Sequence, residues 1–108
     1  MKLPKVYIAG PYSRGDVADN VRTAIEAANE INQMGAVPYV PHLTHFWDLM
    51  TPKSYKWWLW YDLQWLVTCD MLVRLPGLSK GADQEVEEAK CLGMLVFYGL
   101  EELRAALE

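Results

Sequence analysis

Three acidic residues, Asp62, Asp70 and Glu85, stand close in the chain to a predicted buried strand and to the helices on either side of it. Two carboxylates that face one pocket can cleave a glycosidic bond, because one attacks or stabilises the anomeric carbon while the other orients groups or exchanges protons. Acids near the start of a helix can instead complement the helix dipole or form a solvated face. The spacing alone does not show that these carboxylates converge, so both interpretations stay open.

Two polar loops are candidates for holding a phosphate. They carry Gly10, Ser13, Arg14 and Gly15 after the first predicted strand, and Ser79, Lys80 and Gly81 after the third. Hydroxyls, backbone N–H groups and a guanidinium all donate hydrogen bonds to an anion, although ordinary turn chemistry explains each loop equally well. The chain has neither the dinucleotide fingerprint GxGxxG nor the GxxxxGK[ST] motif, which disfavours redox cofactors and NTP-driven phosphoryl transfer.

The histidines and cysteines do not form a recognisable metal or redox motif. His42 and His45 have a spacing that suits metal ligands only on a helix, and Pro41 precedes what we expect to be a loop. We therefore expect no metal, assign the pair to a wall of the ligand pocket, and name His45 as a substrate contact. Cys69 and Cys91 are too few for a disulfide framework, so we expect two reduced thiols.

The elements that must position these residues alternate along the chain. Short β-type runs cover residues 5–9, 36–40, 71–75 and 94–98, and helical patterns cover 17–34, 54–68, 83–92 and 100–107. This alternation predicts an α/β fold with a parallel sheet and helices on both faces. It places Glu85 in the first turn of the helix after the third strand, beside the carboxyl edge of the sheet, where such folds bind ligands.

Residues 41–55 are expected to form a long irregular connection, and the helix that follows is unusually aromatic. Four tryptophans lie within nine residues of it: Trp57, Trp58, Trp60 and Trp65. They cannot all face one small core. Part of this surface can be buried between copies of the chain, and one or two rings can stack on a ligand.

Composition narrows the class of protein. A chain of 108 residues fits a single domain over residues 1–108, and no apolar stretch is long enough to span a membrane. The net charge of −4, without a Lys/Arg run, argues against a nucleic-acid polymer as partner. The chain leads straight into a strand pattern, and we expect a cytoplasmic protein.

Four ordered motifs resemble the nucleoside 2-deoxyribosyltransferase superfamily. They are VYIAGPYS at residues 6–13, N-x-x-x-A from residue 20, D-L-x-W-L-x-x-x-D at 62–70 and S-x-G-x-x-x-E at 79–85. The chain is most similar to the branch of 2′-deoxynucleoside 5′-monophosphate N-glycosidases. This resemblance implies a Rossmann-like, flavodoxin-type sheet of four to five strands and cleavage or transfer of an N-glycosidic bond without metal or organic cofactor.

The resemblance also implies roles for individual residues. Glu85 would attack the anomeric carbon and form a glycosyl ester, assisted by Asp62 and oriented by the hydroxyl of Tyr7. Gly10, Arg14 and Ser79 match phosphate contacts of the family, and Asp70 matches an acid at the start of the same strand, the third. With the loop residues Ser13 and Gly81 and with His45, these are the residues expected to contact the substrate or its phosphate. Members of the superfamily often complete each site with a neighbouring subunit, so we expect at least a dimer.

Two other functions stay open. An NAD-type glycohydrolase breaks a similar N-ribosidic bond and could use the same acid. A nucleotide-binding or sensing module could keep the fold without turnover.

Overall fold

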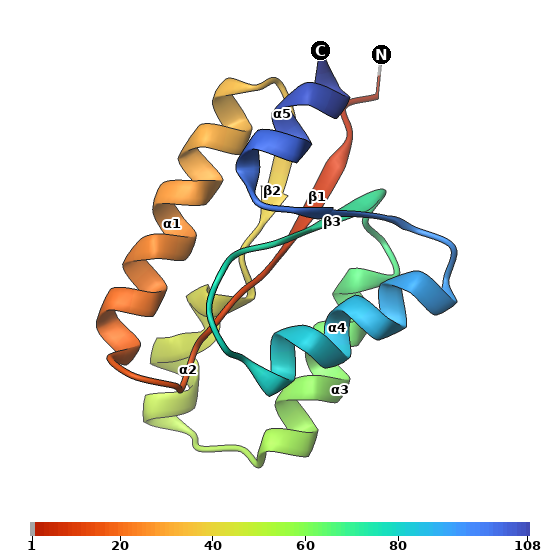
Figure 1. The fold of residues 1–108 in the computed structure, drawn as a ribbon. Helices are drawn as coiled ribbons and strands as arrows, with labels where there is room; N and C mark the ends of the chain where they lie inside the picture. Colours follow the sequence, from red (N-terminus) through yellow and green to blue (C-terminus); the bar gives the residue numbers. More distant parts are fainter. Residues whose placement is uncertain (1) are drawn as a thin grey trace.

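The computed structural model describes residues 2–108 as a four-stranded parallel sheet covered by helices on both faces (Figure 1). In chain order the elements are β1 (Lys5–Ala9), α1 (Val17–Gln33), β2 (Val37–Tyr39), η1 (Pro41–Thr44), α2 (His45–Met50), α3 (Tyr55–Leu66), β3 (Met71–Arg74), α4 (Lys80–Cys91), β4 (Leu95–Tyr98) and α5 (Leu100–Leu107). The predicted α/β class is confirmed.

The strand order is β2-β1-β3-β4, the flavodoxin-type order in which the chain reverses direction beside β1. β1 is a continuous apolar strand because it is buried on both faces, and residues 6–9 are fully inaccessible. Tyr7 lies opposite Tyr39 of β2 and Leu72 of β3. The reversal opens a crevice at the carboxyl ends of β1 and β3, which is where ligands bind in such sheets.

Alternate residues of β1 belong to two separate cores. Val6 and Ile8 pack with residues of α1 and α5, including Ile31 and Leu103. Tyr7 and Ala9 pack on the other face, in a cluster whose further members are Leu66, Leu72, Ala82, Val86 and Ala89. The second core therefore anchors α3 and α4, the two helices that carry the candidate acids.

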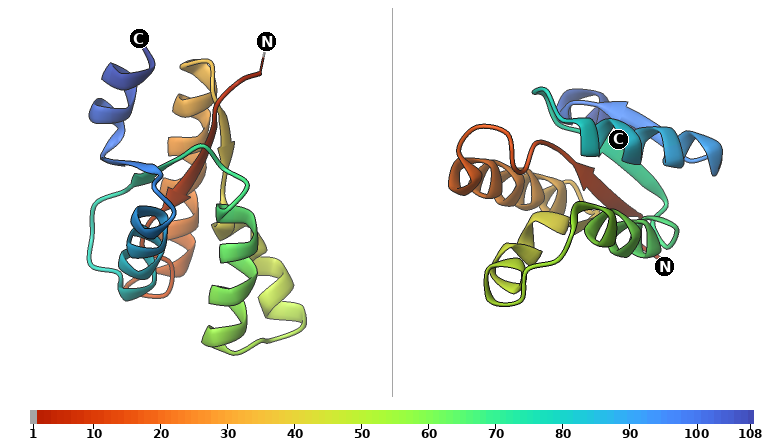
Figure 2. Two further views of the ribbon diagram at one scale, coloured as in Figure 1. Left: turned by 90° about the vertical axis from the view of Figure 1, so that its right-hand side faces the viewer. Right: turned by 90° about the horizontal axis from the view of Figure 1, so that it is seen from below.

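Helices α2 and α3 extend beyond the carboxyl ends of the strands, at the end of the molecule opposite α5 (Figure 2). The expectation of an irregular connection over residues 41–55 is wrong, because Pro41 begins η1 and α2 follows directly. Asp48 holds this segment against α3 by accepting hydrogen bonds from the Lys53 N–H, at 3.1 Å, and from the indole N–H of Trp58, at 2.6 Å.

Helix α4 begins three residues earlier than predicted. The Ser79 hydroxyl accepts a hydrogen bond from the Ala82 N–H at 3.1 Å and caps the helix, so Glu85 lies in the second turn, not in the first. Within residues 2–108, no helix has the length and apolar character needed to cross a membrane.

Candidate active site

A cavity of about 850 Å³ opens at the carboxyl edge of the sheet. Its walls come from the loop after β1, from η1 and α2, from the first half of α3, and from the loop and first turns after β3. Both Asp62 and Glu85 line it. The two carboxylates that the sequence left unplaced therefore converge on one cavity.

Glu85 is held by Tyr7 at the floor of this cavity. The Tyr7 hydroxyl donates a hydrogen bond to Oε2 of Glu85. Glu85 is only 8% exposed, and its burial raises the pKa of the carboxyl group to about 8, although the Tyr7 hydrogen bond and the Arg74 charge act in the opposite direction. At neutral pH a large fraction of this carboxyl group is protonated.

Asp62 stands on α3 at the same cavity. Burial raises the pKa of its carboxyl group to about 7. Its Oδ1 atom is buried without a hydrogen-bond partner among the described residues. A buried acceptor without a partner is costly, and a ligand that donates a hydrogen bond would remove that cost.

Aromatic stacking fixes the ring of Tyr7. Its ring stacks on Tyr39 with centroids 5.5 Å apart, and Tyr39 stacks on Trp65 at 5.8 Å. Burial, followed by the negative charge of Glu85, raises the pKa of Tyr7 well above its ordinary value. Tyr7 therefore remains a neutral hydrogen-bond donor to Glu85.

The predicted phosphate loops also meet at this cavity. Gly10, Ser13, Arg14, Ser79 and Gly81 all line it. The first loop is shaped from α1, since the Asn20 amide donates hydrogen bonds to the carbonyl oxygens of Tyr12, at 2.8 Å, and Arg14, at 2.7 Å. The geometry brings the candidate anion ligands together with the two acids.

Three predicted site residues do not line the cavity. Tyr7 is fully inaccessible and reaches it only through its hydrogen bond to Glu85, whereas Asp70 and His45 lie elsewhere. Asp70 precedes β3 at the amino edge of the sheet, where its Oδ2 accepts a hydrogen bond from the Lys5 N–H at 2.8 Å. This contact ties the starts of β1 and β3 together, so the placement of Asp70 in the substrate site is not supported. His45 approaches the cavity only through Tyr12, whose hydroxyl lies 2.7 Å from its Nδ1.

Of the two histidines expected at a wall of the pocket, His42 is the one that lines it, and His45, the one named as a substrate contact, does not. His42 is 4% exposed and donates through Nε2 to the Pro11 carbonyl oxygen at 3.0 Å. This bond leaves Nδ1 as an acceptor, and Nδ1 has no partner among residues 2–108. The sequence feature that could have indicated His42 is its position directly after β2 and Pro41, which places it at the carboxyl edge of the sheet.

The tryptophans have a structural role besides the two expected from the sequence, which were contact between subunits and stacking on a ligand. The Trp47 ring of α2 contacts Trp57, Trp58 and Tyr61 of α3 edge-on, with centroids 5.2–5.6 Å apart. Trp58 and Tyr55 line the cavity, and the Tyr55 hydroxyl donates to Gln84 of α4. Much of the aromatic surface therefore joins α2 to α3 and builds one wall.

Comparison with known proteins gives a family and a fold. Residues 4–99 match the model of a domain of unknown function, DUF7768. No curated protein matches the sequence. Among solved structures, a 2-deoxyribosyltransferase from Bacillus psychrosaccharolyticus, described as a biocatalyst for nucleoside synthesis, superposes with a TM-score of 0.60 at 19% identity, covering 87% of this chain and 70% of that chain.

Proposed function

We propose that this chain, which belongs to the family of the domain of unknown function DUF7768, cleaves or transfers the N-glycosidic bond of a nucleoside or nucleoside 5′-monophosphate. The observation that carries the proposal is the buried hydrogen bond from Tyr7 to Glu85, with Asp62 on the same cavity. The sequence motifs and the fold shared with a solved 2-deoxyribosyltransferase support it.

In the first step, ionised Glu85 attacks the anomeric carbon of the sugar. The bond from that carbon to the base nitrogen breaks, its electron pair leaves with the base, and a glycosyl ester forms on Glu85. Tyr7 holds one oxygen of the carboxylate through its hydrogen bond, which leaves the other oxygen to act as nucleophile. In the second step, water or a second base attacks the same carbon and releases Glu85.

Asp62 is suited to assist the departure of the base. With a pKa of about 7, it carries a proton in part of the molecules at neutral pH and can donate it to the leaving base. Alternatively, its unpartnered Oδ1 accepts a hydrogen bond from the sugar. His42, with a fixed tautomer and a free acceptor, is placed to contact the base from the opposite wall.

The polar loops are suited to a 5′-phosphate. The Arg14 guanidinium supplies positive charge, and the hydroxyls of Ser13 and Ser79 can donate hydrogen bonds. The Ser79 oxygen already accepts from the Ala82 N–H, so its own hydrogen is left for a ligand. None of these steps requires a metal or an organic cofactor.

A direct test is to incubate the protein with nucleosides, deoxynucleosides, their 5′-monophosphates and NAD, and to quantify the free base. Glu85→Gln should abolish release, whereas Glu87→Gln, an exposed acid on the same helix, should leave it unchanged. Equal release by the Glu85→Gln variant would refute the assignment of the nucleophile. Nicotinamide release from NAD alone would favour the glycohydrolase, and nucleotide binding without release of a base would favour a sensing module.

A further inference from the structure

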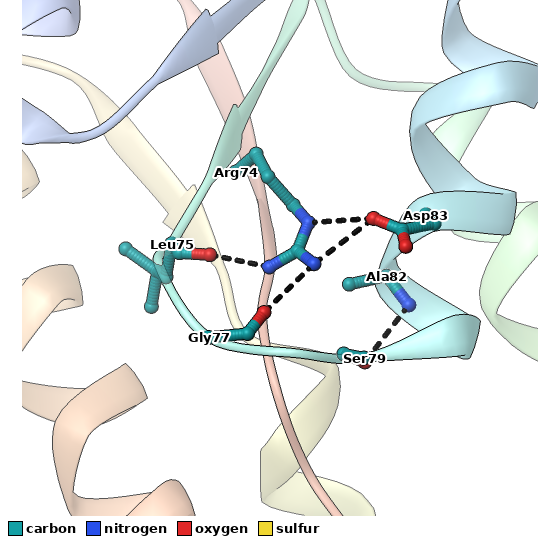
Figure 3. A network of polar contacts seen from close by, with 6 residues as sticks. All are labelled: Arg74, Leu75, Gly77, Ser79, Ala82 and Asp83. Carbon is teal, nitrogen blue, oxygen red and sulfur yellow. Dashed lines mark hydrogen bonds and ion pairs between the residues drawn. The ribbon is translucent and has the colours of Figure 1, made fainter.

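Arg74 is a buried cation at the carboxyl end of β3 that has no role in the proposed chemical steps. Its side chain is only 11% exposed, although it lies within a short apolar strand. A buried guanidinium is costly unless its donors are satisfied. Figure 3 shows that it points into the loop between β3 and α4, close to the start of the helix that carries Glu85.

The guanidinium bonds to both ends of this loop. Nη1 donates to the Leu75 carbonyl oxygen, and Nη2 donates to the Gly77 carbonyl oxygen at 2.9 Å. Nε and Nη2 donate to Oδ1 of Asp83 in α4, at 3.3 Å and 2.9 Å. One side chain therefore joins the strand end, the middle of the loop and the first turns of α4, and Ser79 lies between these points.

The same loop is packed against the loop after β1. Gly77 has a φ of +113°, and a Cβ atom there would lie 2.8 Å from Cγ of Pro11. The Pro11 carbonyl oxygen in turn accepts the hydrogen bond from His42. Contacts therefore run from Arg74 through Gly77 and Pro11 to His42, and they link the loops that follow three of the strands.

A simple surface ion pair does not explain this arrangement. Asp83 is 70% exposed, and exposed pairs contribute little to stability. Arg74 serves three separate acceptor groups at once, two backbone carbonyl oxygens and a carboxylate. The spread donors of a planar guanidinium reach all three, whereas an ammonium group places its donors on a single nitrogen. The features to be explained are thus a fixed loop and a positive charge fixed against Asp83, at the start of the helix that carries Glu85.

We propose that Arg74 is a positioning residue, which holds the loop of residues 75–79 in the shape that presents Ser79 to the substrate and keeps a positive charge at the first turns of the helix that carries Glu85. This inference rests on the proposed function for its substrate. It acts through the loop and through Glu85 and touches no reacting atom.

Several charged or titratable groups act on Glu85 from the surrounding elements. Tyr7 donates its hydrogen bond from β1, and the Arg74 charge favours the ionised carboxylate from β3, whereas the Asp62 charge disfavours it from α3. Tyr39 of β2 and Tyr55 of α3 also interact electrostatically with Glu85. Because Arg74 acts against burial and against Asp62, its removal should raise the pKa of Glu85.

The test compares Arg74→Lys, which keeps the charge and loses the fork, with Arg74→Met, which loses both. Arg104→Met is the control, because Arg104 pairs with Glu101 on the surface of α5. Three kinds of measurement are made: steady-state kinetics (KM and kcat) with a cleaved nucleoside monophosphate, amide hydrogen exchange of residues 75–83, and the Glu85 titration by carboxyl ¹³C NMR. Glu85→Gln is used to assign the NMR signal.

We expect both Arg74 variants to raise KM by about tenfold with a smaller change in kcat, and to speed exchange in the loop. Only Arg74→Met should raise the Glu85 titration midpoint, because only this variant removes the positive charge. A merely structural arginine would not produce this difference between the two variants. An Arg74→Met protein with wild-type titration, or with wild-type KM and loop exchange, would overturn the inference.

Two further arrangements keep the test decisive. If Arg74→Met does not fold, Asp83→Asn replaces it: the loop should loosen while the Glu85 midpoint does not rise, and a rise would overturn the inference. If the wild-type protein cleaves no nucleoside, the proposed function fails. Titration and hydrogen exchange still decide whether Arg74 positions the loop and the carboxylate, because neither measurement needs turnover.

Discussion

Replacing Glu85 by Gln should make the protein more stable at neutral and alkaline pH. Burial raises the pKa of this carboxyl group from 4.5 to about 8, so the folded chain holds a proton that the unfolded chain releases over this range. The stability contributed by protonated Glu85 is therefore fully present below pH 4.5 and is lost as the pH rises to about 8. Gln keeps the shape and accepts the Tyr7 hydrogen bond without this loss.

The size of the effect follows from the same two values. Each pKa unit corresponds to about 1.4 kcal/mol, so the full rise of the pKa corresponds to roughly 5 kcal/mol above pH 8. At pH 7 only the part of this range from pH 4.5 to pH 7 contributes, so we expect Glu85→Gln to stabilise the fold by ~3 kcal/mol. This is a large part of the free energy of unfolding of a typical domain, which is about 5–15 kcal/mol.

The assay is urea unfolding of the wild type, Glu85→Gln and Glu87→Gln at several pH values from 4.5 to 8.5. The difference in unfolding free energy between Glu85→Gln and the wild type should be near zero at pH 4.5 and grow with pH. Asp62 titrates in both proteins, so the cost of its own burial cancels in the difference, and only its electrostatic coupling to Glu85 remains. If Glu85→Gln and Glu87→Gln track the wild type equally across this range, Glu85 is not a buried acid and the reasoning fails.

Four further outcomes are expected. The kcat/KM for base release should peak between pH 7 and 8, because Glu85 must be ionised and, where Asp62 acts as an acid, Asp62 must be protonated; a profile that rises steadily past pH 9 would exclude that acid. Tyr7→Phe should lower kcat by about 10–100-fold. It should also move the ascending limb to higher pH, because the Tyr7 hydrogen bond lowers the pKa of Glu85 and its removal raises that pKa. Arg14→Ala should raise KM for nucleoside monophosphates by about tenfold and leave KM for nucleosides unchanged, and an equal change for both would place the phosphate elsewhere. The protein should sediment as a dimer or larger species, and Phe46→Asp, on the exposed apolar side of α2, should shift it towards monomer if this side is the interface.

Much of the fold could be predicted because burial leaves a strong pattern in the sequence. The strand at Lys5–Ala9 and the helix at Leu100–Leu107 have the predicted bounds, since apolar runs and turn residues mark both ends. The convergence of the loops on one edge follows from the parallel topology alone. The start of α4 was predicted three residues too late, because Gly81 has a low helix propensity although it lies in the first turn after the Ser79 cap.

The details of the site were harder to predict because they depend on contacts with the backbone. Arg74 appears in the sequence as an interruption of an apolar strand, and two of its partners are carbonyl oxygens, which carry no residue signature. His42 and His45 cannot be ranked without knowing that η1 turns the first towards the cavity. Asp70 and Asp62 are both aspartates near the same strand in the sequence. Only the direction of the strand places Asp70 at the amino edge of the sheet, whereas Asp62 lines the cavity at the carboxyl edge.

Tyr7 is at once a fully inaccessible member of the core under α3 and α4 and the hydrogen-bond donor to Glu85. The proposed catalytic site and the hydrophobic core thus share one side chain, and a mutation of Tyr7 should impair both. If the proposed function holds, new substrate preferences should arise from sequence changes in α2 and the first half of α3, the wall whose aromatic rings belong to neither core cluster. Mutant libraries for altering base choice are best confined to that wall.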